Sequence, residues 1–144
     1  MIRSMNDTHK RLLLTSLQHL QPLRSEAAGI FISRLFEIAP YVRPLFHGDV
    51  TTHGTKFMEM VEQTILAMDD EESLRIRLRS MGRTHAMVGV ARAHYDIIAS
   101  ALLWTLDRVL GEHCTEEVRS AWIALYVFVS TEMKQGAADL YRAA

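Results

Sequence analysis

Apolar residues recur at steps of three and four along most of the chain, the spacing that places side chains on one face of an α-helix. Two of these faces carry a histidine: His53 opens one that continues through Phe57 to Ile65, and His85 closes another that includes Met81. Only three prolines and seven glycines interrupt the periodicity, and no alternating five-residue pattern typical of a strand holds up. The chain is therefore predicted to be all-α.

The interruptions predict where the helices begin and end. Asn6, Asp7 or Thr8 can cap a first helix that Pro22 ends, and Gly111 separates the last two helices. The other predicted elements are a helix over about residues 24–38, a short one from Pro40, one after a turn at 48–52, one that starts in the acidic run 69–72, and the last two over 91–110 and 115–141. No repeat, linker or low-complexity segment divides them, so a single domain spanning residues 1–144 is expected.

Length, composition and charge narrow the class of protein. A chain of 144 residues buries about two-thirds of the surface that it exposes when unfolded. Hydrophobic residues make up 49% of the sequence, which is enough for a full core. The formal net charge is −1 and no block of Lys or Arg appears, so nucleic acid is not expected as a partner.

Three features bear on where the protein is found. The longest apolar run, residues 121–129, is shorter than half of the ~20 residues that a membrane-spanning helix needs. Residues 1–7 are too polar for a signal peptide. Cys114 stands alone, so an intrachain disulfide is impossible. We therefore expect a cytoplasmic protein without a membrane partner.

The two histidines carry the candidate chemistry. Neither has a cysteine or carboxylate pattern beside it that would complete a zinc site, whereas two imidazoles on separate buried helical faces suit an iron macrocycle held between helices. The second ring nitrogen of an iron-bound imidazole needs an acceptor, and for His85 the Met81 carbonyl is expected. Simpler interpretations are a hydrogen-bonded helix-end residue for His85 and a solvent-facing residue for His53.

Several short motifs follow one another in a specific order and cover nearly the whole chain. They are IFISRLF at 30–36, PLF at 44–46, HGTKFM at 53–58, GRTH at 82–85, VGV at 88–90, HY at 94–95, ALLW at 101–104 and AWxxxY at 121–126. In this order they resemble the globin family, and within it bacterial single-domain globins related to the haem domain of flavohaemoglobins, with neuroglobin-like traits.

The resemblance implies a globin fold, a three-over-three helical sandwich around haem b. It implies His85 as the iron ligand, Phe46 as the phenylalanine that stacks on the haem, and His53 on the distal side as a hydrogen-bond donor or a sixth ligand. Lys56 can reach a haem propionate or simply be solvated. The full set of expected haem-binding residues is Ile32, Phe46, His53, Lys56, Phe57, Met81, His85, Val90 and Tyr95.

The chain departs from the flavohaemoglobin pattern at three positions. Where those proteins place a distal tyrosine and glutamine, this sequence has Ile32 and His53, and the position of their proximal glutamate is Ala137. Only Tyr95 matches their proximal tyrosine. The departures favour a globin that reversibly binds a diatomic gas (O2, NO or CO). They leave open a nitric oxide dioxygenase or nitrite reductase fed by a separate reductase, a redox or gas-sensor globin, or a helical domain without haem.

Overall fold

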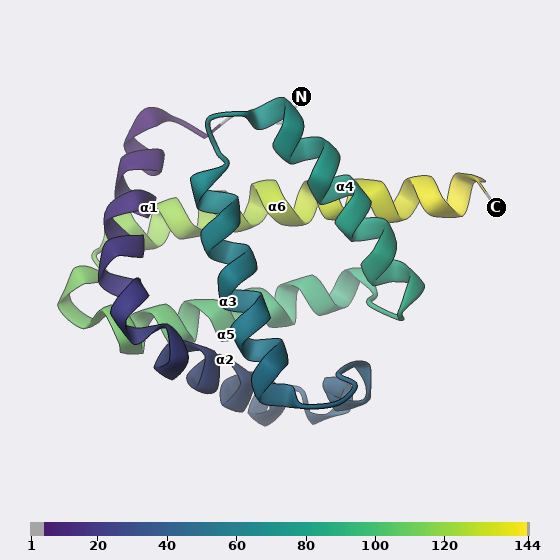
Figure 1. Cartoon of the computed structure of the whole chain (residues 1–144), viewed down its shortest axis with the longest axis horizontal. Helices are drawn as coiled ribbons and strands as arrows, with labels where there is room; N and C mark the ends of the chain where they lie inside the picture. The colour runs from purple at the N-terminus through teal and green to yellow at the C-terminus, as the bar shows by residue number, and fades with distance from the viewer. Residues whose placement is uncertain (1–4, 144) are drawn as a thin grey trace.

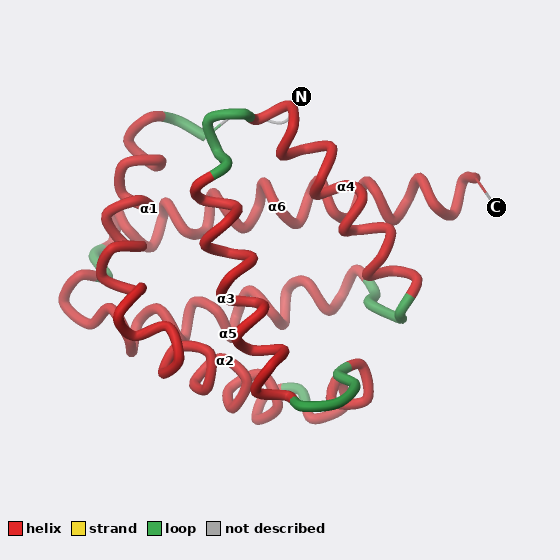
Figure 2. The backbone as a smooth tube through the Cα atoms, in the orientation of Figure 1, coloured by secondary structure: helices red, strands yellow, loops and turns green. Residues whose placement is uncertain are grey.

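The protein is described by a computed structural model that covers residues 5–143. Over this range the chain forms six α-helices and three short 3-10 helices, and Figure 2 shows no strand. The α-helices are α1 (Asp7–Leu20), α2 (Arg24–Ile38), α3 (Val50–Leu66), α4 (Glu71–Met87), α5 (Arg92–Leu110) and α6 (Glu116–Ala143). The all-α prediction is confirmed. The predicted domain 1–144 also includes residues 1–4 and 144, which lie outside the described residues.

The helices form two crossed layers (Figure 1). Helices α1, α3 and α4 make one layer, and α2, α5 and α6 make the other. The main packing pairs are α4 on α6, α2 on α5, α2 on α3 and α1 on α6. The core between the layers holds large side chains that are almost fully buried, among them Leu35, Met58, Ile65, Leu106 and Trp122. This arrangement confirms the predicted three-over-three sandwich.

Side-chain caps mark the beginning of α1, α3 and α4. The Asn6 side chain accepts a hydrogen bond from the His9 N–H at 2.7 Å, and the Asp70 side chain accepts one from the Ser73 N–H at 3.2 Å. Asp49 does the same for α3, where its carboxylate accepts from the Thr51 N–H at 2.9 Å. Because of this cap, α3 begins at Val50, within the segment 48–52 that the sequence predicted to be a turn.

No single helix within residues 5–143 is both long and apolar enough to cross a membrane, although α4 and the segment Arg92–His113 together meet the length and composition criteria as a pair bent by 111°.

Candidate functional site

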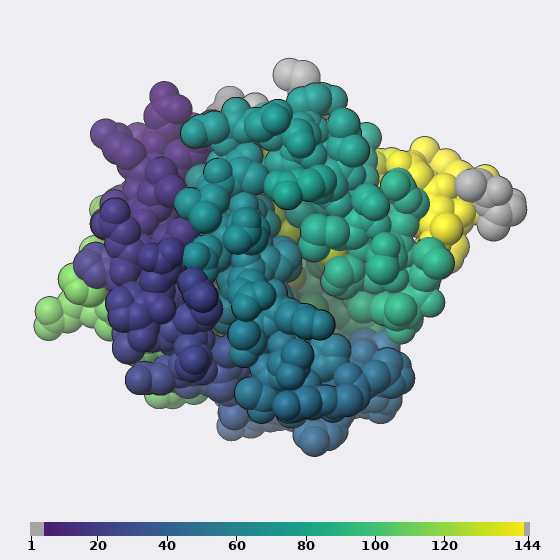
Figure 3. Space-filling model, viewed as in Figure 1, coloured from purple at the N-terminus to yellow at the C-terminus, as the bar shows by residue number. Residues whose placement is uncertain are grey.

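A cavity of about 430 Å³ lies between the two layers, within the usual range of about 300–1,000 Å³ for ligand pockets. Its walls come from α2, the 3-10 segment Pro40–Leu45, α3, α4 and α5. In the space-filling view the surface is hollowed between α3 and α4 (Figure 3). Most of the lining is apolar, and the two candidate histidines, His53 from α3 and His85 from α4, both contribute to it.

His85 has the geometry that a metal-binding imidazole requires. Its Nδ1 atom lies 2.7 Å from the Met81 carbonyl oxygen, one helical turn earlier. Because a carbonyl oxygen only accepts, Nδ1 carries the proton and donates it, which leaves the lone pair of the neutral ring on Nε2. The predicted acceptor for His85 is thus confirmed, and the bond fixes the tautomer and orientation of the ring.

The chain turns sharply just after His85. Helix α4 ends at Met87, and Gly89 adopts φ +102°, a conformation that favours glycine. The Val90 N–H then donates to the His85 carbonyl oxygen at 3.0 Å. This turn places Val90 in the cavity wall, as the sequence predicted.

His53 lies near the start of α3 and is held by the preceding loop. Its Nε2 lies 2.6 Å from the His47 carbonyl oxygen, so Nε2–H donates in this conformation. The ring also contacts Phe46 edge to face, with a centroid separation of 5.4 Å. His53 is half-buried and lines the cavity, which excludes the purely solvent-facing interpretation.

Two aromatic pairs shape the apolar part of the cavity. Phe31 and Phe57 stack at a centroid distance of 4.1 Å with nearly parallel rings, and Phe36 packs edge to face on Phe46. Phe31, Phe46 and Phe57 all line the cavity. The predicted positions of Phe46 and Phe57 in the pocket are therefore correct.

Ile32 lies outside the cavity lining. The sequence placed it over the pocket, but it is absent from the cavity lining, and Phe31 occupies that wall instead. Ile32 is buried where α2 meets α3, since its Cγ1 lies 2.8 Å from the position that a Cβ on Gly54 would take. Neighbouring helix residues point about 100° apart, so a shift of one position changes the wall that a side chain reaches.

Tyr95 is the second expected haem-binding residue that lies outside the cavity lining. It is buried, but it too is absent from the cavity lining. Burial raises the pKa of its phenol, and the Lys134 ammonium lies 5.5 Å from the ring centroid. The Tyr126 hydroxyl donates a hydrogen bond to the Tyr95 carbonyl oxygen, and burial raises the pKa of Tyr126 strongly. Tyr95 thus belongs to the contact between α5 and α6.

The remaining predicted residues, Met81 and Lys56, line the cavity. Lys56 is exposed, as its long charged side chain favours. Arg83 and Arg92 are exposed and do not line the cavity.

His94 is a lining residue that sequence reasoning missed. Its Nδ1 accepts a hydrogen bond from the Ala91 N–H at 2.8 Å at the start of α5. The proton of the neutral ring therefore sits on Nε2, and the ring lines the cavity. Its position three residues after a helix start was the signal available in the sequence. Met60, Ile97 and Ile98 also line the cavity and were missed.

The donor set fits an iron macrocycle better than a bare metal ion. No group of three or more His, Cys, Asp or Glu side chains that could hold a metal occurs within residues 5–143. A macrocycle supplies its own equatorial nitrogens and needs from the protein one axial imidazole and an apolar slot. His85 Nε2 and the apolar lining offer both.

Comparison with known proteins identifies the family. The model of the Globin family matches residues 30–133. This match spans well over half of the chain. The chain belongs to the globin family.

Related sequences and solved structures agree with the family match. Neuroglobins of Chaenocephalus aceratus and Danio rerio are 29% and 27% identical, over 94% of this chain and 94% of each relative. A hexacoordinated heme protein from an anhydrobiotic tardigrade shares the fold with a TM-score of 0.82 at 16% identity, covering 92% of this chain and 95% of its own. An engineered carbene transferase, made from a putative nitric oxide dioxygenase of Rhodothermus marinus, gives 0.86 at 24% identity and covers 97% and 98%. At these identities the solved structures show the fold alone.

Proposed function

We propose that this protein is a haem-binding globin that reversibly binds a diatomic gas, with His85 as the protein ligand of the iron. The observation that carries the proposal is the hydrogen bond from His85 Nδ1 to the Met81 carbonyl, which leaves Nε2 as the metal-binding atom at an apolar cavity. A bound haem b would supply an iron that can bind O2, NO or CO.

Different residues of the cavity would make apolar and polar contacts with this group. Phe46, Phe57, Met81 and Val90 provide apolar contact and keep water away from the macrocycle. Lys56 and the Nε2–H of His94 are the cation and the donor available to the propionates. The proposed haem would thus be held by one axial bond, apolar burial and polar contacts at its edge.

His53 is proposed as the distal hydrogen-bond donor. Its Nε2–H already donates a hydrogen bond to the His47 carbonyl oxygen. To reach a gas molecule or the iron, His53 must give up that bond, whose net contribution is about 0.5–1.5 kcal/mol. Replacing the His47 carbonyl by a gas molecule as the partner of His53 therefore costs little free energy. The loop that holds His53 favours a donor role over permanent ligation.

Internal ligation by His53, with a redox or sensing role, is the second candidate. The observation in its favour is the similarity over 94% of the chain to neuroglobins, together with a fold shared with a hexacoordinated heme protein. An enzyme that consumes NO or reduces nitrite with a separate reductase has weaker support, because Tyr95 lies outside the cavity lining and Ala137 replaces the proximal glutamate.

The test is a visible absorption spectrum of the haem-loaded, dithionite-reduced protein under argon, followed by addition of CO and then its removal. One broad high-spin band that CO converts reversibly to a low-spin spectrum supports the gas-binding proposal. Two sharp low-spin bands before CO is added support the second candidate. Fast consumption of NO in the presence of O2 and a reductase would instead favour the enzyme.

A further inference from the structure

Helix α4, which carries His85, depends on one neighbour for its place in the fold. Its extensive packing is with α6, and its contacts with the other helices are sparse. Figure 1 shows α4 crossing the C-terminal half of α6. The position of His85 in the cavity is therefore set mainly by how α4 sits on α6.

Two glycines bring the backbones of these helices into direct contact. A Cβ on Gly82 would lie 1.9 Å from the Met133 carbonyl oxygen, and a Cβ on Gly136 would lie 1.9 Å from the Arg79 carbonyl oxygen. Each helix thus presses a glycine against a carbonyl of the other. This reciprocal contact fixes the separation of α4 and α6, but it does not by itself prevent sliding along the axis.

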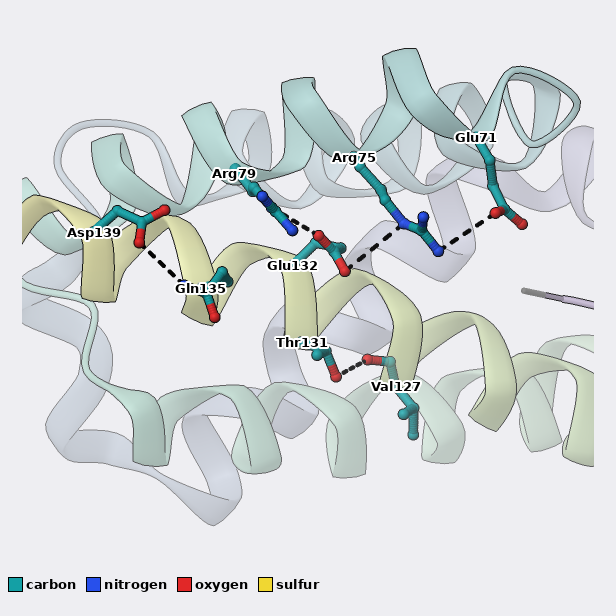
Figure 4. Close-up of polar contacts among 8 residues, drawn as sticks. All are labelled: Glu71, Arg75, Arg79, Val127, Thr131, Glu132, Gln135 and Asp139. Atoms are coloured by element: carbon teal, nitrogen blue, oxygen red, sulfur yellow. Dashed lines mark hydrogen bonds and ion pairs between the residues drawn. The ribbon is translucent and has the colours of Figure 1, made fainter. Parts of the chain in front are cut away.

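A buried carboxylate lies beside this crossing. Glu132 of α6 has no exposed surface, and its Oε1 accepts a hydrogen bond from Arg79 Nε at 2.9 Å. Its Oε2 lies 3.9 Å from Arg75 Nε, and neither of these two atoms has a hydrogen-bond partner. Figure 4 shows both arginines reaching from α4 toward the one carboxylate.

The spacing of the two arginines relates the cluster to the position of α4 along its helix axis. Arg75 and Arg79 are one turn apart on the same face of α4, about 6 Å along its axis. A single carboxylate that faces both of them opposes sliding of α4 in either direction, because each shift lengthens one charged contact. A buried carboxylate also loses much if its partners move away.

We propose that Glu132, through Arg79 and Arg75, is a positioning residue that sets the axial register of α4 on α6 and hence the position of the His85 ring in the cavity. The inference rests on the proposed function, since it concerns the histidine proposed to bind iron. It assigns no contact between Glu132 and the haem. Gly82 and Gly136 set the helix separation, and Glu132 sets the register.

The test compares Glu132→Gln, which keeps the shape and removes the charge, with Arg119→Gln as a control. Arg119 also lies on α6, but it pairs with Asp107 of α5, away from α4. Two readouts are used. The first is amide hydrogen exchange of α4 in the haem-free protein, and the second is the iron–histidine stretching band in the resonance Raman spectrum after haem loading and CO photolysis.

We expect Glu132→Gln to speed exchange in α4 by about tenfold or more, the equivalent of one lost charge-assisted hydrogen bond, and to shift or broaden the iron–histidine band. Arg119→Gln should change neither. A uniform rise in exchange over all helices with an unchanged band would overturn the proposal, because it would indicate a merely structural ion pair. If Glu132→Gln does not fold, Arg79→Gln, at a half-exposed residue, carries the same expectations.

The two proposals fail in different ways. A wild-type protein that takes up no haem would overturn the proposed function, while the exchange comparison in the haem-free protein would still test the register of α4. A wild-type protein that binds haem, with α4 exchange and the iron–histidine band unchanged in Glu132→Gln, would overturn the positioning role alone.

Discussion

The Nε2 atom of His53 donates a hydrogen bond to the carbonyl oxygen of His47, 2.6 Å away, across the turn that precedes α3. The proposed distal histidine is thus tied to the backbone by the same nitrogen that would reach a ligand in the cavity. A backbone carbonyl in a loop, rather than a second side chain, sets the free energy needed to release this histidine.

The first prediction concerns this bond. His53→Leu removes the proposed donor and should raise the O2 dissociation rate about tenfold, the equivalent of a hydrogen bond to a partly charged acceptor. His47→Ala is the matched control, because it keeps the carbonyl and should leave the rate nearly unchanged. Stopped-flow displacement of O2 by CO measures both variants. An unchanged rate in His53→Leu would remove His53 from the distal role.

The second prediction concerns the crossing of α4 and α6. Gly82→Ala places a Cβ against the Met133 carbonyl, so the helices must separate, and overpacking of this kind costs about 1–3 kcal/mol or more. Gly29→Ala is the control, because Gly29 lies on the exposed side of α2 with nothing within 4 Å of its added Cβ. That variant should gain about 0.5–1 kcal/mol from better helix propensity. Urea unfolding measures both, and equal effects would contradict the close crossing.

The third prediction concerns the edge of the cavity. His94→Leu removes the proposed propionate donor and the acceptor for the Ala91 N–H, so haem should transfer several-fold faster to an excess of a competing apoglobin. Arg92→Gln should transfer haem at the wild-type rate, since Arg92 does not line the cavity. Faster haem loss from Arg92→Gln than from His94→Leu would show that Arg92, and not His94, contacts the propionates.

The fourth prediction concerns acid stability. A hydrogen bond from Arg119 holds the pKa of Asp107 below its ordinary value of 3.8. The ion pair therefore stabilises the fold above that value, and its contribution is lost as the pH falls through the lowered pKa. Both side chains are well exposed, so the contribution is at most about 1 kcal/mol.

Urea unfolding of the haem-free protein at several pH values measures this contribution. Asp107→Asn should be less stable than wild type at neutral pH, and the difference should vanish in strong acid. A difference that persists unchanged at low pH would show that the charge of Asp107 is not its source.

Local patterns in the sequence predicted the helices, and seven of the nine residues expected to bind haem line the cavity. The periodic faces around His53 and His85 predicted that both imidazoles lie on buried helical faces, and the four-residue step from Met81 to His85 predicted the hydrogen bond that the structure contains. These relationships lie within one helical turn or one apolar face, where spacing alone determines geometry.

The expected and observed lining residues differ where tertiary contact decides between neighbouring positions. Both Phe31 and Ile32 are buried, and only the way α2 packs on α3 determines that Phe31 faces the cavity while Ile32 faces Gly54. Tyr95 was assigned by resemblance, and the packing of α5 on α6 directs it away from the cavity lining. The cluster around Glu132 joins residues 53 positions apart, so no local pattern predicts it.

The central claim is that His85 binds the iron of a haem held in this cavity. It is tested most directly by titrating haem into purified wild-type protein and into His85→Ala and recording the visible spectrum. We expect a sharp endpoint at one haem per chain for the wild type, and weak binding without that endpoint for the variant. Equal stoichiometry, affinity and spectrum in the two proteins would contradict it.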